Sequence, residues 1–180
     1  MKITYIAFLR GINVGGHRVK MQHLKKMFEH LGLENVRTYI QSGNVSFDAP
    51  KINRKLLQNK IEKQLLQELG YQVPTFLRTI AELENSLHAA PFKNMETTPK
   101  TRYFIMFTSG QLPKNLHLPM YSQKKDFTVV GIEGEDMFVV LDLNVGKPGN
   151  PALFVEKTFK VTTTSRFYHT LVKILESAKS

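Results

Sequence analysis

The 180-residue sequence predicts an α+β protein made of two similar halves that pack together. Short stretches of alternating or continuous apolar residues are typical of strands, and longer stretches with apolar residues every three or four positions are typical of helices. Glycine, proline and helix-capping residues separate these stretches. The order of elements in the second half roughly repeats the order in the first, although the amino-acid sequence itself does not repeat.

The first half predicts the order strand, helix, strand, strand, helix, strand. The expected elements are a strand over 2–10, a helix over 21–31, strands over 35–41 and 45–48, a helix over 53–69 and a strand over 72–78. Gly32 ends the first helix, and Asn53 caps the second. A Ser42-Gly43-Asn44 turn joins the two middle strands. This order is the ferredoxin-like, or split βαβ, arrangement.

The chain divides into a first half over 1–79, a helical linker over 80–99 and a second α+β half over 100–180. Thr79 and Glu82 have the spacing of a capping box that opens the linker helix, and Pro91 ends it. The second half contains expected strands over 101–108, 127–132 and 137–143, a helix around 151–157 and a terminal helix capped by Thr164 or Ser165.

The composition excludes several classes of protein. The chain has no cysteine, which excludes disulfides, thiolate metal sites and thiol nucleophiles and fits a cytoplasmic location. No apolar run reaches the roughly eighteen residues of a membrane span, so we expect no membrane association. The short apolar run after Lys2 has no small-residue cleavage site behind it, so we expect no signal peptide.

The net charge of +10 is spread along the chain. Lys and Arg outnumber Asp and Glu by 7 to 3 over 1–50, by 9 to 5 over 51–110 and by 9 to 7 over 111–180. Such an excess attracts nucleic acid or phosphorylated molecules, but its even distribution favours a surface charge that keeps a protein in solution. The sequence has no basic tail or block.

Two polar, glycine-containing stretches, 10–18 and 41–44, form the candidate site. The split βαβ order places the loop after the first strand beside the turn between the second and third, with Tyr71 and Gln72 nearby. The candidate ligand-binding residues are Arg10, Asn13, Gly15, Gly16, Arg18, Gln41, Ser42 and Asn44. We expect the N–H groups of Gly15 and Gly16 at a helix amino terminus, which favours a phosphate or carboxylate. Alternatively, the glycines only permit tight turns, and Asn13 and Ser42 bond the backbone.

Other candidate sites are weaker. The loop matches neither the dinucleotide-binding fingerprint nor a P-loop, and we expect no cofactor. His23 and His30 are two helical turns apart, too far to share a metal ion unaided, so we expect no metal site. Thr164 and Arg166 form a possible second patch, because an arginine in the first turn of a helix is electrostatically unfavourable without an anionic partner.

The stretches 5–16, 20–21 and 36–45 closely resemble the bacterial "domain of unknown function 1697" family, and Pro91-Phe92 and the threonine-rich stretch near the carboxyl end fit as well. The resemblance implies a paired ferredoxin-like α+β architecture and no established activity, substrate or cofactor. The family usually shows Thr-x-Arg-Asn-Trp-x-Thr, and this chain has Phe167 and Tyr168 in place of the Asn and Trp. A role of that Asn therefore does not carry over.

Three functions stay open. The first is a binding module for a phosphate-bearing small molecule or nucleic acid at the glycine loop. The second is a phosphoryl or acyl-phosphate hydrolase, because acylphosphatases share the split βαβ order and use an arginine and a water-orienting asparagine, roles that Arg18 and Asn44 would fill here. The third is a protein-interaction module or homo-oligomer.

Overall fold

The α+β class is confirmed by the computed structural model, which describes residues 2–92, 98–113, 115–145 and 149–180. Over these residues the chain forms two antiparallel sheets and five α-helices. It divides into two compact units, Met1–Glu84 with Lys173–Ser180, and Asn85–Val172. The last helix ends in the unit where the chain begins, because Arg37 donates to the Ser177 carbonyl and Lys179 pairs with Glu84.

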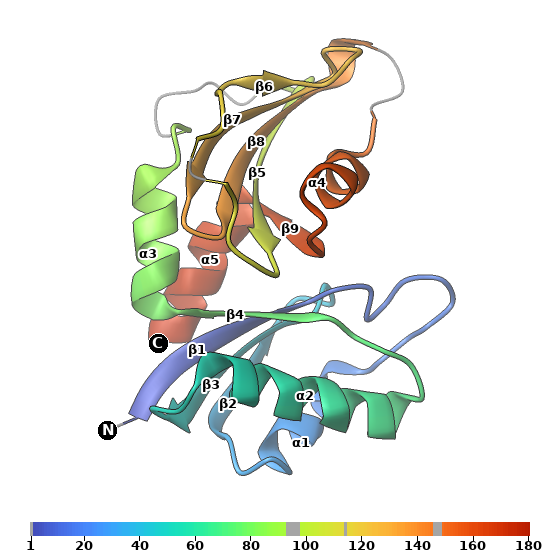
Figure 1. The fold of residues 1–180 in the computed structure, drawn as a ribbon. Coiled ribbons are helices and arrows are strands. Elements are labelled where there is room, and N and C mark those ends of the chain that lie inside the picture. Colours follow the sequence, from blue (N-terminus) through green and yellow to red (C-terminus); the bar gives the residue numbers. More distant parts are fainter. Residues whose placement is uncertain (1, 93–97, 114, 146–148) are drawn as a thin grey trace. The chain divides into compact units, whose positions relative to one another are not determined.

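The first unit has the split βαβ order. Its elements are β1 (Lys2–Leu9), α1 (Met21–Glu29), β2 (Glu34–Tyr39), β3 (Asn44–Pro50), α2 (Arg54–Leu69) and β4 (Thr75–Thr79). The strands lie in the order β2-β3-β1-β4, and every neighbouring pair is antiparallel. The first two strands therefore run in the same direction, and β3 lies between them. Figure 1 shows α1 and α2 on one face of this sheet.

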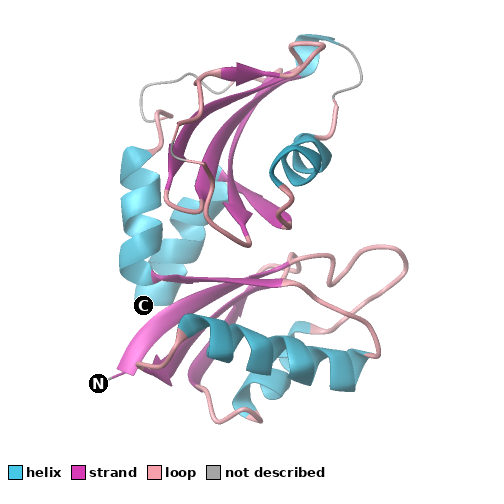
Figure 2. Cartoon of the chain, viewed as in Figure 1, coloured by secondary structure: helices cyan, strands magenta, loops and turns pink. Residues whose placement is uncertain are grey.

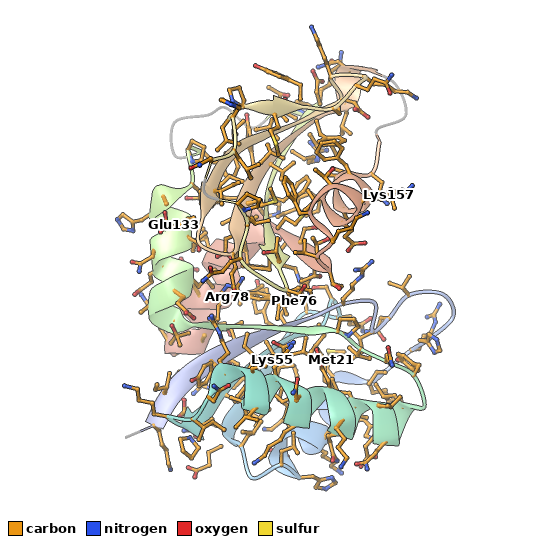
Figure 3. All side chains as sticks on the ribbon, viewed as in Figure 1. Met21, Lys55, Phe76, Arg78, Glu133 and Lys157 are labelled. Carbon is orange, nitrogen blue, oxygen red and sulfur yellow. The ribbon has the colours of Figure 1, made fainter. Side chains whose placement is uncertain are left out.

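Every second side chain of the strands points into the core between the first sheet and its helices. Tyr5, Ala7 and Leu9 point from β1 into a buried cluster that includes Phe28 of α1 and Ile61 of α2. The remaining residues of the strands point to the opposite face. Figure 3 shows Phe76 and Arg78 of β4 on this opposite face, away from the helices that carry Met21 and Lys55.

The helix boundaries in the first unit follow the predicted caps. The Asn53 side chain accepts hydrogen bonds from the N–H groups of Lys55 and Leu56, and Gly70 ends α2 in the left-handed conformation. The Glu82 carboxylate accepts from the Thr79 N–H at 2.8 Å, and the Thr79 hydroxyl accepts from the Glu82 N–H at 3.1 Å. The predicted capping box is therefore confirmed, and it opens α3 (Ile80–Ala89).

The second unit repeats the strand order of the first but not its first crossover helix. Its elements are β5 (Thr101–Thr108), β6 (Met120–Tyr121), β7 (Phe127–Glu133), β8 (Asp136–Asp142), a short 3-10 helix (Leu143–Val145), α4 (Pro151–Phe159), β9 (Thr163–Phe167) and α5 (Tyr168–Lys179). The order β7-β8-β5-β9 matches β2-β3-β1-β4, and β6 adds an edge strand. Between β5 and β7 the described residues form no helix, as Figure 2 also shows.

The predicted cap of the last helix is wrong. Thr164, Ser165 and Arg166 belong to β9, which pairs antiparallel with β5, and α5 begins only at Tyr168. This stretch is rich in threonine, whose side chain is β-branched, so it suits a strand as well as a helix cap. The exposed edge of β5 decides between these alternatives, because its unpaired backbone groups need a partner strand.

Both faces of the second sheet contact side chains of the second unit. Phe104, Val139 and Val155 belong to a buried cluster between the sheet and α4. On the other face, the Phe92 ring contacts the rings of Tyr103, Phe138 and Tyr168. The linker helix therefore ends in an aromatic anchor, while residues 93–97 of the predicted linker lie outside the described part of the chain.

Candidate functional site

The two polar stretches meet at one end of the first sheet, as the topology predicts. The Leu9 N–H donates to the Gly43 carbonyl at 2.8 Å, and the Asn13 side-chain amide donates to the Gln41 carbonyl at 2.8 Å. The Tyr71 hydroxyl donates to the Ile12 carbonyl at 2.9 Å. Three segments therefore form one surface, which we call the rim: the glycine loop 10–20, the hairpin loop 40–43 and the segment 70–74.

The glycine loop is an open, irregular connection between β1 and α1 (Figure 2). Gly11, Gly15 and Gly16 have φ values of 70°, 66° and 92°, and a methyl group added at each would meet nothing within 4 Å. Glycine is therefore needed at these positions for the positive φ, and not because another part of the protein packs closely against them. The expected position of Gly15 and Gly16 at a helix amino terminus is wrong, because the residue before α1 is Lys20.

The hairpin loop is one residue longer than the predicted Ser42-Gly43-Asn44 turn. Tyr39 pairs with Asn44, so the connection consists of residues 40–43. A methyl group on Gly43 would lie 2.8 Å from the Ile12 Cγ2 atom and 3.0 Å from the Leu9 Cβ atom. Ile40 has a φ of 47° and is 51% exposed, which is uncommon for a β-branched residue. No sequence pattern predicts a positive φ at this position.

The two asparagines of the site hold the backbone. Asn13 accepts from the Val19 N–H at 2.7 Å while its amide group contacts the hairpin loop, so it fixes both ends of the glycine loop. Asn44 is buried, and its amide donates to the Tyr39 carbonyl and the Ser42 hydroxyl. The water-orienting role expected of Asn44 in a hydrolase therefore has no support, because both amide hydrogens are used inside the hairpin.

The exposed surface of the rim is basic. The segments 10–23, 39–45 and 70–74 contain Arg10, Arg18 and Lys20 and no Asp or Glu. Arg10 is half-buried, and its N–H donates to the Pro74 carbonyl, whereas the Arg18 side chain is exposed. Gln41 and Ser42 are exposed on the hairpin loop, which contacts the glycine loop through Asn13. A ligand at the rim meets cations and hydrogen-bonding groups but no carboxylate from these segments.

An aromatic stack lies on the rim. The His17 and Tyr71 rings are 3.8 Å apart at their centroids, with 25° between their planes. Burial raises the pKa of the Tyr71 hydroxyl, which keeps it protonated and able to donate to the Ile12 carbonyl. The strand order predicts both residues at this end of the sheet, but it does not predict that their rings stack, because ring contacts depend on side-chain packing.

The possible second patch at Thr164 and Arg166 has a different environment from the expected one. Arg166 lies in β9 and not in a first helical turn, so the electrostatic argument for an anionic partner is wrong. Its guanidinium donates to the Thr164 hydroxyl at 3.0 Å and to the Ser165 carbonyl at 2.8 Å. Burial lowers the pKa of Arg166 to about 10. These contacts give both side chains a structural role in the strand.

His23 of α1 and His30, the residue directly after α1, lie near an acidic residue of α2. His23 Nε2 lies 3.9 Å from one oxygen of Glu68, and His30 Nδ1 lies 4.0 Å from the other. No group of three or more potential ligands that would hold a metal ion occurs in the described part of the chain. Over the same residues, no helix has the length and apolar character needed to cross a membrane.

Comparisons with known proteins agree with the fold and the motifs. The family model described as "Protein of unknown function (DUF1697)" matches residues 2–138, and no curated protein matches the chain. The fold is similar to that of the conserved bacterial protein SP0830 from Streptococcus pneumoniae, with 23% sequence identity, a TM-score of 0.71 and 100% coverage of both chains. Because the family model spans most of the sequence, including both stretches of the rim, the chain belongs to the DUF1697 family.

Proposed function

We propose that the protein binds an anionic, phosphate-bearing ligand at the rim. The observation that carries the proposal is the convergence of three segments, of which the glycine loop carries Arg10, Arg18 and Lys20 and none carries a carboxylate. Positively charged side chains attract a phosphate that lies within a few ångströms of them, and added salt weakens this attraction. A surface that only keeps the protein in solution normally carries both signs of charge.

The backbone of the glycine loop supports the same proposal. Among the described residues, none accepts a hydrogen bond from the N–H of Gly15 or Gly16, and both glycines are exposed. Backbone N–H groups are strong donors that bond water or a ligand when no protein acceptor is present. Arg18 follows these glycines closely in the chain, and arginine binds phosphate through paired hydrogen bonds. The loop therefore offers a charged group and two neutral donors over four residues.

The loop is also held in position before a ligand arrives. Asn13 fixes its beginning and its end, and Tyr71 holds its beginning a second time through the Ile12 carbonyl. A site whose backbone is already ordered loses less conformational entropy on binding than a mobile loop. Gly15 and Gly16 lie between the anchored residues Asn13 and Val19, where a phosphate reaches their N–H groups without displacing a protein contact.

Calorimetric titration with pyrophosphate and with ribose 5-phosphate tests the proposal. We expect binding that weakens with added salt, and we expect Arg18→Ala to weaken it about tenfold, which corresponds to the loss of one charge-assisted contact. Lys63→Ala is the matched control, because it removes one exposed positive charge from α2 outside the rim. Absence of binding, or an equal loss in both variants, would overturn the proposal.

A further inference from the structure

We infer that the rim takes a nucleotide, with the base stacked on the His17 ring and the phosphate on the glycine loop. The inference rests on the proposed anion site and specifies the rest of the ligand. The phosphate accounts for the basic side chains but not for the aromatic stack beside them. A flat ring held parallel to a second ring on an exposed loop is the arrangement on which nucleic-acid-binding proteins stack bases.

The stack is a fixed platform. The Tyr71 ring is half-buried, and its hydroxyl is anchored on the Ile12 carbonyl at 2.9 Å. The His17 ring lies on Tyr71 with 3.8 Å between centroids, so one face of the imidazole is covered. His17 as a whole is exposed, which leaves the other face to the solvent. A base placed there extends the stack without moving a protein group.

The distance between platform and phosphate donors suits a nucleotide. Gly15 and His17 are two residues apart, so their backbones are separated by at most about 7 Å. Arg18 follows His17 directly, and Lys20 lies two residues further. A base on the His17 ring therefore brings its own 5′-phosphate within the span of Gly15, Gly16 and Arg18. Two apolar residues of the rim, Val14 and Ile40, are 67% and 51% exposed and offer further contact area for a flat ligand.

The same chemistry is present in a free mononucleotide and in single-stranded nucleic acid. Stacking on an aromatic side chain tolerates any base, because every base has a π-face. The experiment therefore compares adenosine 5′-monophosphate, ribose 5-phosphate and an oligo(dA) of eight residues by calorimetric titration. Equal affinity for the mononucleotide and for each site on the oligonucleotide supports a free nucleotide, whereas an affinity that rises with strand length supports a single strand.

We expect adenosine 5′-monophosphate to bind about tenfold more tightly than ribose 5-phosphate, as the stacking of one base predicts. His17→Ala should remove this difference, so that adenosine 5′-monophosphate and ribose 5-phosphate bind that variant with equal affinity. His17→Phe should restore it, because phenylalanine keeps a flat ring and loses only the ring nitrogens. In NMR spectra, the His17 Hε1 signal, identified by its absence in His17→Ala, should move upfield when the nucleotide binds.

The outcomes separate this inference from the proposed function. If adenosine 5′-monophosphate and ribose 5-phosphate bind with equal affinity, and Arg18→Ala weakens both, the nucleotide inference is overturned and the anion site still stands. Absence of binding by every phosphate would overturn both. A loss of nucleotide binding in His17→Phe equal to that in His17→Ala would also overturn the stacking argument. Thermal denaturation of both variants checks that the exposed substitution leaves the fold intact.

Discussion

The two sheets of this protein place a hairpin loop beside the end of the first strand in the same way, yet the chemistry at the two positions is opposite. In the first sheet, Phe8 pairs with Asn44, and the Leu9 N–H donates to the Gly43 carbonyl. In the second sheet, Phe107 pairs with Asp136, and the Thr108 N–H donates to the Glu135 carbonyl at 2.9 Å. The backbone geometry is therefore repeated between the sheets.

The residues around this repeated hydrogen bond differ. The first hairpin loop presents Gln41 and Ser42, whereas the second consists of Gly134 and Glu135. After β1 the Arg10 N–H bonds to the Pro74 carbonyl, and after β5 the Ser109 N–H bonds in the same way to the Thr162 carbonyl. Only the second connection adds a side-chain bond there, from the Thr162 N–H to the Ser109 hydroxyl, whereas the first continues into the open glycine loop. The strand order therefore creates the position, and the loop sequences make only the first one basic and open.

The connection after β5 is also closed further along by a buried carboxylate. Asp126 accepts hydrogen bonds from the Ser122 hydroxyl and from the Gly149 N–H, and its own N–H donates to Ser122. The glycine loop of the first sheet is anchored by neutral side chains, Asn13 and Tyr71. The second unit therefore uses a buried charge, Asp126, to stabilise its connection. The charged side chains Arg18 and Lys20 of the glycine loop are instead exposed to solvent.

The largest expected effect comes from adding a methyl group at Gly43, in the first hairpin loop. Gly43→Ala should lower the free energy of unfolding by about 3 kcal/mol, because the new methyl group meets Ile12 and Leu9 and the φ of 74° disfavours alanine. Gly11→Ala, at a similar φ of 70° in open space, should cost only about 1 kcal/mol. Chemical denaturation measures both. Equal losses would show that the close contact between loop and turn has no energetic weight.

The second largest effect concerns the carboxylate of the second unit. Asp126→Ala should lower the free energy of unfolding by about 2 kcal/mol, because it leaves the Ser122 hydroxyl and the Gly149 N–H without their charged acceptor. The hydrogen bond from Ser122 and the one from Gly149 lower the pKa of Asp126. A lowered carboxyl pKa stabilises the fold above the ordinary value of 3.8, and this stabilisation disappears as the pH falls through the folded-state pKa.

Denaturation midpoints measured between pH 7 and pH 2 check the sign of this effect. The wild type should lose stability more steeply than Asp126→Asn once the pH falls below about 4. Asp48 of the first sheet, whose pKa is lowered by hydrogen bonds from Asn35 and Thr4, remains in both proteins and contributes equally to both curves. Parallel curves for the wild type and Asp126→Asn would contradict the prediction.

A third prediction removes the chemical difference between the two hairpin loops. Gln41→Glu gives the first loop a carboxylate like the one that Glu135 gives the second, and it leaves the side-chain size nearly unchanged. We expect phosphate affinity to fall about tenfold, or about 1.4 kcal/mol, with the thermal midpoint nearly unchanged, because Gln41 is exposed. Gln67→Glu on α2 is the control for the change in net charge. Equal effects of the two substitutions would assign the loss to net charge alone.

The smallest expected effect is a gain in stability. Ile40→Asn should raise the free energy of unfolding by about 0.5 kcal/mol, because asparagine tolerates the positive φ that strains an exposed isoleucine. If the exposed Ile40 side chain contributes contact area to the ligand, the same variant should bind adenosine 5′-monophosphate more weakly. Thermal denaturation and calorimetry measured on one preparation resolve the two effects. A destabilised variant would mean that Ile40 packs in the folded protein.

Much of the first unit follows from its sequence. Asn53, Gly70 and the Thr79-Glu82 pair mark helix ends through local hydrogen bonds that need no distant partner. The meeting of the two stretches at the rim followed from strand order, because parallel β1 and β2 with β3 between them leave one arrangement for the connecting loops. The start of α5 was missed, since Thr164 and Ser165 satisfy a strand as well as a cap, and the pairing with β5 selects the strand.

The amino-acid sequence by itself determined which segments fold locally, where the glycines let the chain turn, and that the rim carries cations and no carboxylate. The tertiary structure alone decided that Asn44 is sealed inside the hairpin, that Ile40 carries the positive φ and that His17 lies flat on Tyr71. Local propensities and net charge are properties of nearby residues. Burial and ring contact arise only when segments far apart in the chain compete for the same space.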